Sequence, residues 1–226
     1  MKKITILILM VFGYFSNAIA IEGVNIGASI TGGAFELDGG KEEFKGAHVG
    51  GASPGDISKA TSDDAEGAAV FVSVFAEYEV NDQVAFGIDY VPQSLDTETS
   101  ENVQNESGSD VTNKVQVDFS NLATLYARIN LPDVEGVYIK AGYIHVDVET
   151  NENLGTGGAY PDAEFDGYTI AVGYDRALDN DAFVRLEAMY MDFDGDTVTS
   201  SNDSTKSITA DGLNGYGARI SIGRSF

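Results

Sequence analysis

The sequence predicts an all-β protein, an eight-stranded antiparallel up-and-down barrel that spans a membrane. Three observations support this fold class. The chain opens with an export signal, apolar residues alternate with small or polar ones in about eight segments, and short and long connections alternate between those segments. Successive side chains of a strand point to opposite faces, so each segment has one apolar face. Behind an export signal, such repeated alternation is typical of a barrel whose apolar face meets lipid.

Residues 1–20 have the composition of a secretory signal peptide. Two lysines supply the positive start, 4–15 are apolar, and Ala18 and Ala20 form a small-residue cleavage site. About a dozen apolar residues are too few to span hydrocarbon as a helix, which needs roughly twenty. We therefore expect the barrel domain to occupy residues 21–226, and an N-terminal anchor helix is the alternative.

The composition narrows the classes of function. The formal net charge is −23, and such a chain repels nucleic acid, so no nucleic-acid partner is expected. The charge is compatible with a diffuse attraction of cations. The chain contains no cysteine, which excludes a disulfide framework and thiolate chemistry. The mean hydropathy of −0.09 is modest, as expected when apolar and polar faces alternate.

Eight strands are predicted, at 23–37, 67–80, 84–94, 114–130, 136–148, 165–176, 182–193 and 212–226. Seven of them alternate clearly, and the fifth is ambiguous. Its outward set is expected to be Val137, Ile139, Ala141 and Tyr143. The apolar Ile144, Val146 and Val148 then point inward, and a β-bulge near Gly142 would reconcile the two sets.

The connections indicate the orientation of the barrel. Short turns are predicted at 81–83, 131–135 and 177–181, and long connections at 38–66, 95–113, 149–164 and 194–211. The long connections together carry twenty acids and four lysines, in a sequence rich in Gly, Ser, Thr and Asn. Short periplasmic turns and longer outer loops are the rule in outer-membrane barrels. We therefore expect four acidic extracellular loops and both ends of the domain in the periplasm.

Aromatic residues on the outward parity suggest two interface belts. Near the long connections the belt would contain Tyr90, Tyr143, Tyr168, Tyr190 and Tyr216, and near the short turns Tyr78, Tyr174 and Phe226. Tyr and Trp are enriched where a membrane protein meets the headgroups. Ordinary strand aromatics of a soluble β-sandwich are the alternative.

The inward parity carries opposite charges in nearly equal number. The acids are Glu77, Glu79, Asp89, Asp175 and Glu187, and the bases are Arg128, Lys140, Arg185 and Arg219. An eight-stranded barrel is just wide enough for its side chains to fill it, so these charges must pair. A structural ion-pair plug is one interpretation and a gate that swaps partners is the other. Small inward residues could also leave water-filled cavities: Gly27, Ser29, Ala85, Gly87, Gly173, Gly217 and Ser221.

The end of the chain resembles the signal that the outer-membrane assembly machinery reads. Its residues are Tyr216, Ala218, Ile220, Ile222 and the terminal Phe226. With the export signal and the strand pattern, this ending is similar to the small outer-membrane β-barrel superfamily, the porin-like proteins that include the OmpA and OmpX types. The resemblance implies a location in the bacterial outer membrane, with lipid and the assembly machinery as partners. It leaves an extracellular partner unknown, because fold does not fix function.

The sequence offers little catalytic or metal chemistry. Only His48 and His145 could move protons at neutral pH, and neither has a serine fixed nearby in sequence. The segment 192–196 alternates three aspartates, yet its glycine is misplaced for an EF-hand loop, which wants it where Thr197 stands. We therefore predict no catalytic residues, metal site or cofactor. The expected function is a non-enzymatic envelope protein that displays acidic loops, and a small pore for ions or solutes is the alternative.

Overall fold

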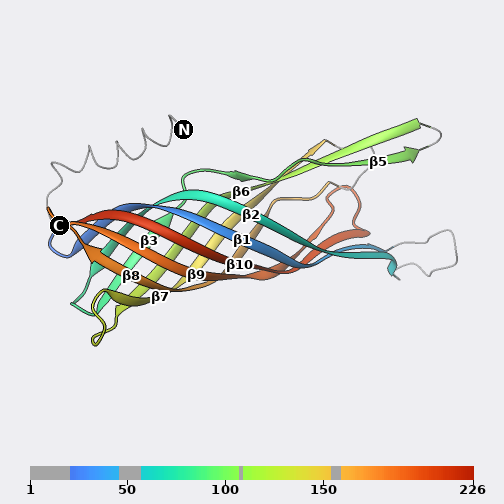
Figure 1. Cartoon of the computed structure of the whole chain (residues 1–226). Helices are drawn as coiled ribbons and strands as arrows, with labels where there is room; N and C mark the ends of the chain where they lie inside the picture. The colour runs from blue at the N-terminus through green and yellow to red at the C-terminus, as the bar shows by residue number, and fades with distance from the viewer. Residues whose placement is uncertain (1–20, 46–56, 107–108, 154–158) are drawn as a thin grey trace.

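The computed structural model describes residues 21–45, 57–106, 109–153 and 159–226 (Figure 1). The predicted signal segment 1–20 and His48 lie outside these residues. In the described part of the chain no helix is long and apolar enough to cross a membrane. All regular elements there are β-strands.

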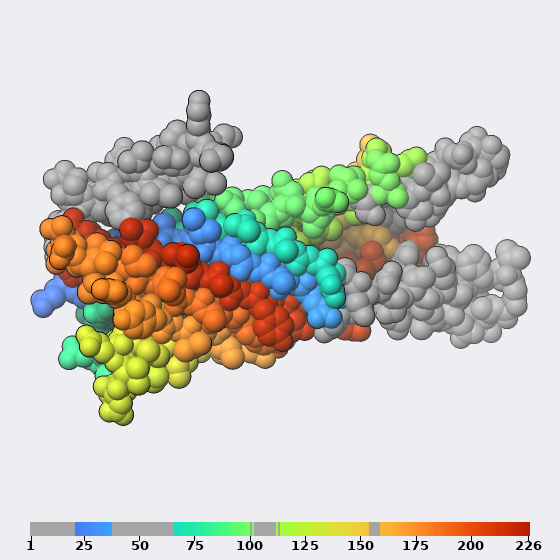
Figure 2. Space-filling view, in the orientation of Figure 1, coloured from blue at the N-terminus to red at the C-terminus, as the bar shows by residue number. Residues whose placement is uncertain are grey.

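Eight strands build the wall: β1 (Val24–Lys45), β2 (Ile57–Glu79), β3 (Val84–Tyr90), β6 (Ser109–Asn130), β7 (Val137–Asn153), β8 (Ala163–Ala177), β9 (Ala182–Thr199) and β10 (Lys206–Ser225). Two short strands, β4 (Leu95–Asp96) and β5 (Ser100–Glu106), pair with β6. All neighbours are antiparallel, and the pairing of β1 with β10 closes the barrel. Figure 2 shows β2, β1 and β10 side by side along one face.

The alternation along each strand sorts apolar side chains to the outside of the barrel. In β8, Ile170 and Val172 are 50% and 53% exposed, whereas Thr169 and Ala171, which alternate with them, are 1% and 6% exposed. The same outward set contains Ile30, Val70, Phe86, Ile88, Leu125, Ile129, Ile139, Leu186, Ile220 and Ile222. An apolar exterior around a polar interior is the arrangement of a transmembrane barrel. The predicted fold class is confirmed, and the soluble sandwich is excluded because its apolar faces would be buried.

The ambiguity of the fifth predicted strand, β7, has a different solution from the one expected. The pairing of β7 with both neighbours runs without interruption through Gly142, so the bulge predicted there is wrong. The extra residue lies instead in β6, between Ser120 and Ala123, where Asn121 has a φ of 53°. The apolar residues that follow Tyr143 at alternate positions face inward without any break in β7.

The strands end as predicted on one side of the barrel and not on the other. We call the side with the short connections the turn end and the opposite side the loop end. At the turn end the observed bounds lie within two residues of the predicted ones. At the loop end β1 continues to Lys45 and β2 begins at Ile57, so much of the predicted 38–66 connection is paired strand. Beyond the lipid neither face needs to be apolar, so these extensions carry no alternation that a sequence pattern could reveal.

Two seams divide the loop end of the barrel into two arms. The β2–β3 pairing ends at Val74 and Tyr90, where β3 itself ends, and the β8–β9 pairing ends at Gly167 and Phe193. The first arm consists of the outer parts of β2, β1, β10 and β9, and the second of β8, β7 and β6 with β4 and β5. In Figure 1 the two arms diverge at the end of the barrel opposite the C-terminus.

Aromatic rings lie over several of the small inward residues and occupy space in which the sequence suggested cavities. A Cβ atom added at Gly173 would lie 2.3 Å from Tyr138 Cζ, and one at Gly87 would lie 2.4 Å from Tyr126 Cζ. Both tyrosines are buried, with exposures of 1% and 4%. In a barrel this narrow, glycine on one strand makes room for a ring from another.

This packing predicts that Gly173→Ala destabilises the barrel by about 1–3 kcal/mol, because the ring of Tyr138 must move. Gly67→Ala is the matched control, since a Cβ there meets nothing within 4 Å. Its effect should stay within about 0.5 kcal/mol. Urea unfolding in lipid vesicles, followed by gel mobility without boiling, measures both. Equal stability of the two variants would contradict the packing argument.

Candidate functional site

The nine charged residues predicted on the inward parity all lie in the lumen, toward the turn end. Seven are between 2% and 6% exposed: Glu77, Asp89, Arg128, Lys140, Arg185, Glu187 and Arg219. Glu79 and Asp175 lie at the turn-end mouth, with side chains 41% and 21% exposed. We call these nine residues the charged lumen network.

One half of the network is centred on Glu77. Arg185 binds this carboxylate with two N–H groups, at 2.9 Å from Nη2 to Oε1 and 3.1 Å from Nη1 to Oε2. Arg128 Nη2 lies 3.1 Å from the same Oε1. Asp175 Oδ2 accepts from Arg185 Nε at 2.7 Å and from Arg128 Nη1 at 3.0 Å. Glu79 completes the group at 3.1 Å from Arg128. The two arginines therefore share two carboxylates.

The other half joins Arg219 and Lys140 to two further acids. Arg219 Nη1 donates to Asp89 Oδ2 at 3.1 Å, and its Nε donates to Thr31 Oγ1 at 2.9 Å. Lys140 Nζ contacts Glu187, whose other oxygen lies 3.8 Å from Arg219 Nε. A buried charge without a partner is strongly destabilising, and here each buried charge faces an opposite one.

Uncharged side chains that the sequence interpretation missed complete the network. Asn25 Nδ2 donates to Glu77 at 3.2 Å and to Glu79 at 2.8 Å, and Tyr126 Oη donates to Glu77 at 3.2 Å. Ser73 donates to Asp89 at 3.1 Å. Their inward position follows from the same strand parity that identified the charges, so the parity alone could have found them.

Aromatic rings pack against the cations of the network. Arg185 Cζ lies 4.4 Å from the centre of the Phe183 ring, and Lys140 Nζ lies 4.9 Å from that of Tyr126. Arg128 Cζ lies 5.3 Å from the centre of the Tyr138 ring. Such contacts stabilise a desolvated cation and fill the space that an open channel would need.

Toward the loop end the lumen is apolar. A cluster of buried side chains fills it: Ile144, Val146, Val148, Phe165, Ala171, Met189, Met191 and Phe193. Partly buried residues of both arms pack against this apolar plug, among them Phe35 of β1, Leu213 of β10 and Phe119 of β6. The lumen thus holds ion pairs toward the turn end and apolar side chains toward the loop end.

The predicted aromatic belt at the loop end forms a row across four strands. Tyr143 pairs with Tyr168, and Tyr190 pairs with Tyr216 with ring centres 5.0 Å apart. The rings of Tyr168 and Tyr190 are 6.4 Å apart. At the turn end, Tyr78 and Tyr174 are 52% and 47% exposed. Both sets face outward, where aromatic rings meet lipid headgroups.

Hydroxyl groups of the loop-end belt bond to polar residues just beyond it. Tyr168 donates to Asp192 at 2.6 Å, and Tyr190 donates to Asn214 at 2.6 Å. Tyr90 also donates, to Asn121 of the β6 bulge, at 3.2 Å. The belt therefore marks the level at which the outer face changes from apolar to polar.

His145 lies on the outer face of β7, on the loop side of the belt. Its Nδ1 lies 2.7 Å from Asp166 Oδ1 and its Nε2 lies 3.0 Å from Asp147 Oδ1. The bonded Asp166 carboxylate, with Asp147, raises the pKa of His145 above its ordinary value. Each ring nitrogen thus has a carboxylate within hydrogen-bond distance, and neither nitrogen is left free to accept a proton from a substrate.

The three aspartates of 192–196 do not converge on a point. They occupy every second position of β9 and face outward, so each lies about 6.6 Å from the next along the strand. Among the described residues no group of three His, Cys, Asp or Glu side chains is placed to hold a metal ion.

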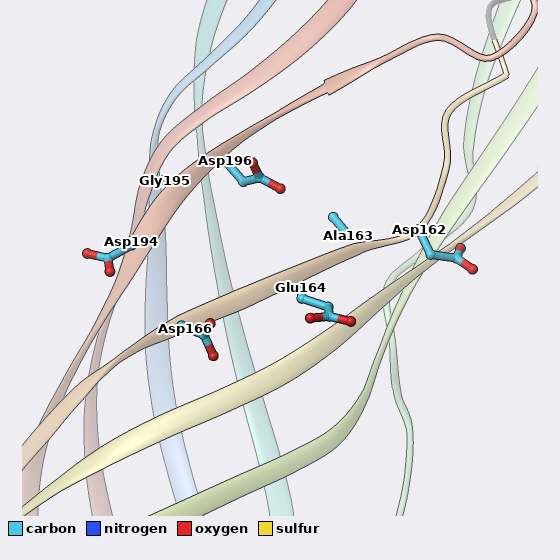
Figure 3. A pocket seen from close by; sticks show the side chains of 7 residues that line it. All are labelled: Asp162, Ala163, Glu164, Asp166, Asp194, Gly195 and Asp196. Carbon is cyan, nitrogen blue, oxygen red and sulfur yellow. The ribbon is translucent and has the colours of Figure 1, made fainter.

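A groove crosses the outer wall at the second seam. It is lined by Asp162, Ala163, Glu164 and Asp166 on the β8 side and by Asp194, Gly195 and Asp196 of β9 (Figure 3). Its volume is about 490 Å³. Beyond it the chain meets again, since Ser201 N donates to Ala159 O at 2.7 Å. We call this feature the wall groove.

The proposed assembly segment forms most of the membrane part of β10. Tyr216, Ile220 and Ile222 are 67%, 60% and 43% exposed on the outer face, and Ala218 lies between them on the same parity. The terminal Phe226 bonds through its N–H to Val24 O at 2.9 Å. The end of the chain is therefore part of the β1–β10 closure.

Removing one partner of the charged lumen network should unfold the barrel more readily. We expect Arg185→Gln to lower the unfolding free energy by about 3–5 kcal/mol, because Glu77 loses its bidentate partner. The exposed pair of Lys114 and Glu101 is the control, and Lys114→Gln should change stability by less than about 1 kcal/mol. Urea unfolding in vesicles compares them. Similar losses in both variants would contradict a dominant buried network.

Comparison with known proteins identifies the family of the chain. No curated protein matches the sequence. Similar solved structures include Neisserial surface protein A, which is 12% identical over 91% of this chain and 98% of its own, with a TM-score of 0.43. OprG from Pseudomonas aeruginosa is 15% identical over 92% of this chain and 98% of its own, with a TM-score of 0.45. The outer membrane protease OmpT from Escherichia coli is 10% identical over 90% of this chain and 96% of its own, with a TM-score of 0.36. The profile of the family described as outer membrane protein beta-barrel domain matches residues 20–226. The protein is therefore a β-barrel of the bacterial outer membrane and belongs to this family.

Proposed function

We propose that the protein is a sealed, non-enzymatic barrel that anchors two acidic β-sheet arms on the cell surface for interaction with other molecules. The observation that carries this proposal is the filled lumen. The charged lumen network and the apolar plug lie one above the other, so a solute entering from the turn end meets ion pairs and then apolar side chains. A conducting path would require both layers to rearrange.

The arms supply the interacting part. They continue the strands beyond the loop-end belt. Their outer faces carry carboxylates such as Asp147, Glu149, Glu164 and Asp194. We place the arms outside the cell and both ends of the barrel domain in the periplasm, because outer-membrane barrels keep short turns on the periplasmic side. The acidic surface attracts cations diffusely and disfavours nucleic acid.

An enzymatic role has no support in the described residues. His145 is held between Asp147 and Asp166, so it lacks the free nitrogen that a general base needs. The partners we propose are outer-membrane lipid, the assembly machinery and a surface ligand. We propose no cofactor.

A narrow gated pore is the second candidate, and one observation favours it. Because Arg128 and Arg185 share Glu77 and Asp175, either arginine could shift without leaving a carboxylate unpaired. The apolar plug beyond them opposes this function, since apolar constrictions exclude water and ions.

Planar bilayer recordings test the seal. We expect the purified wild-type barrel to give no steady ion conductance under conditions where a known porin conducts. Stepwise conductance of the wild type that changes in amplitude or selectivity in Arg128→Gln would refute the sealed barrel and support the gated pore.

Surface labelling of intact cells tests the orientation. An epitope inserted between Asn202 and Asp203, in the connection from β9 to β10, should bind antibody without permeabilisation. The same epitope inserted after Asp133, in the turn from β6 to β7, should bind only after the outer membrane is opened. The reverse result would place the arms in the periplasm and contradict the proposal.

A further inference from the structure

The wall groove is an interruption of the sheet with a free strand edge on each side. Among the residues that the structure describes, β8 is paired only with β7 between Gly167 and Ala163, and β9 only with β10 beyond Phe193. The main-chain groups that face the groove therefore have no ladder partner across it. Free edges of this kind accept an extended peptide as an additional strand.

The size of the groove suits a short segment. The sheet is paired below it at Gly167 and Phe193 and is bonded above it at Ala159 and Ser201. About six residues of β9 lie between these limits, and a strand advances about 3.3 Å per residue. Because β8 and β9 are antiparallel, an inserted strand would be parallel to one and antiparallel to the other, and both pairings are stable.

The two faces of the groove differ in chemistry. On the outer face Glu164, Asp166, Asp194 and Asp196 flank it from both sides. On the inner face the adjoining positions are Ala163, which packs against the apolar plug, and Gly195, which has no side chain. The inner face thus leaves space beside apolar residues, whereas the outer face presents the carboxylates of Glu164, Asp194 and Asp196, besides that of Asp166, which is bonded to His145.

We propose that the wall groove binds an extended basic peptide segment by adding it as a strand between β8 and β9. Its Lys or Arg side chains alternate with small apolar ones, so that the basic set meets the carboxylates and the apolar set meets the plug. The inference deepens the proposed surface interaction and rests on it. A second copy of this chain is a poor occupant, because its net charge of −23 would repel the groove.

Fluorescence anisotropy of the full barrel in zwitterionic micelles tests the site. The probe is a labelled nonapeptide of alternating lysine and valine. Two control peptides are a scrambled sequence of the same composition and the alternating peptide with every second amide N-methylated, which removes its ladder donors along one edge. We expect saturable binding of the first peptide, and at least about tenfold weaker binding of both controls, since the charges stay constant and only strand pairing changes.

Protein variants locate the site. The triple variant Glu164→Gln, Asp194→Asn, Asp196→Asn should weaken binding about tenfold, because three charge contacts of a few tenths to one kcal/mol each are lost. The matched control removes three acids near β4 and β5, with Asp96→Asn, Glu98→Gln and Glu101→Gln, and should bind as the wild type does, apart from a small long-range effect. Gel mobility confirms that each variant folds.

Several results would overturn the proposal. Equal binding of the N-methylated peptide would show charge attraction without strand addition, and equal loss in both triple variants would show diffuse attraction to the whole surface. Calorimetric binding of calcium alone, with no peptide bound, would make the groove a cation site. The bilayer recordings decide the seal independently, so a conducting barrel that binds the peptide would refute the proposed function and leave this site standing.

Discussion

The structure depends on the rule that every main-chain amide and carbonyl inside a membrane must find a partner within the protein. The pairing of β1 with β10 meets this rule by leaving no free edge between the aromatic belts. Closure with eight strands then fixes a narrow interior, and the interior dictates the side chains that fill it. Beyond the belts water can satisfy the main chain, and there the wall separates into two arms with free edges. The same chain is therefore closed where lipid surrounds it and open where water does.

The two layers of the lumen follow from this confinement. Ion pairs occupy one half because a charged side chain in a narrow interior is stable only beside an opposite charge, and Glu77 and Asp175 each serve two arginines. The apolar plug occupies the half nearest the arms and joins them at their base. A filled interior would make the barrel a rigid anchor, as the proposed surface role requires.

The sequence pattern predicted most features of the part of the barrel that lies within the membrane, and few features of the part beyond it. Alternation located the outward apolar residues and the inward charges, because each strand has a lipid face and a lumen face. The strand extensions toward Lys45 and Asn153 were missed, since both of their faces are polar. The bulge was expected at Gly142 but lies at Asn121 in the neighbouring strand, because a pattern along one strand cannot show which partner carries the extra residue. The packing of the Tyr138 ring over Gly173 depends on which residues of neighbouring strands lie opposite each other, and this register cannot be read from the pattern of one strand.

The seal of the lumen is the central claim, and single cysteines test it most directly because the chain has none of its own. Ser73→Cys and Ser221→Cys replace buried lumen residues, 0% and 3% exposed, with a side chain of similar shape. A small water-soluble thiol reagent should leave both unmodified in the folded barrel, react with both after boiling, and react at once with an exposed Ser201→Cys. Rapid modification of the two lumen cysteines in the folded protein would show a water-filled interior and contradict this account.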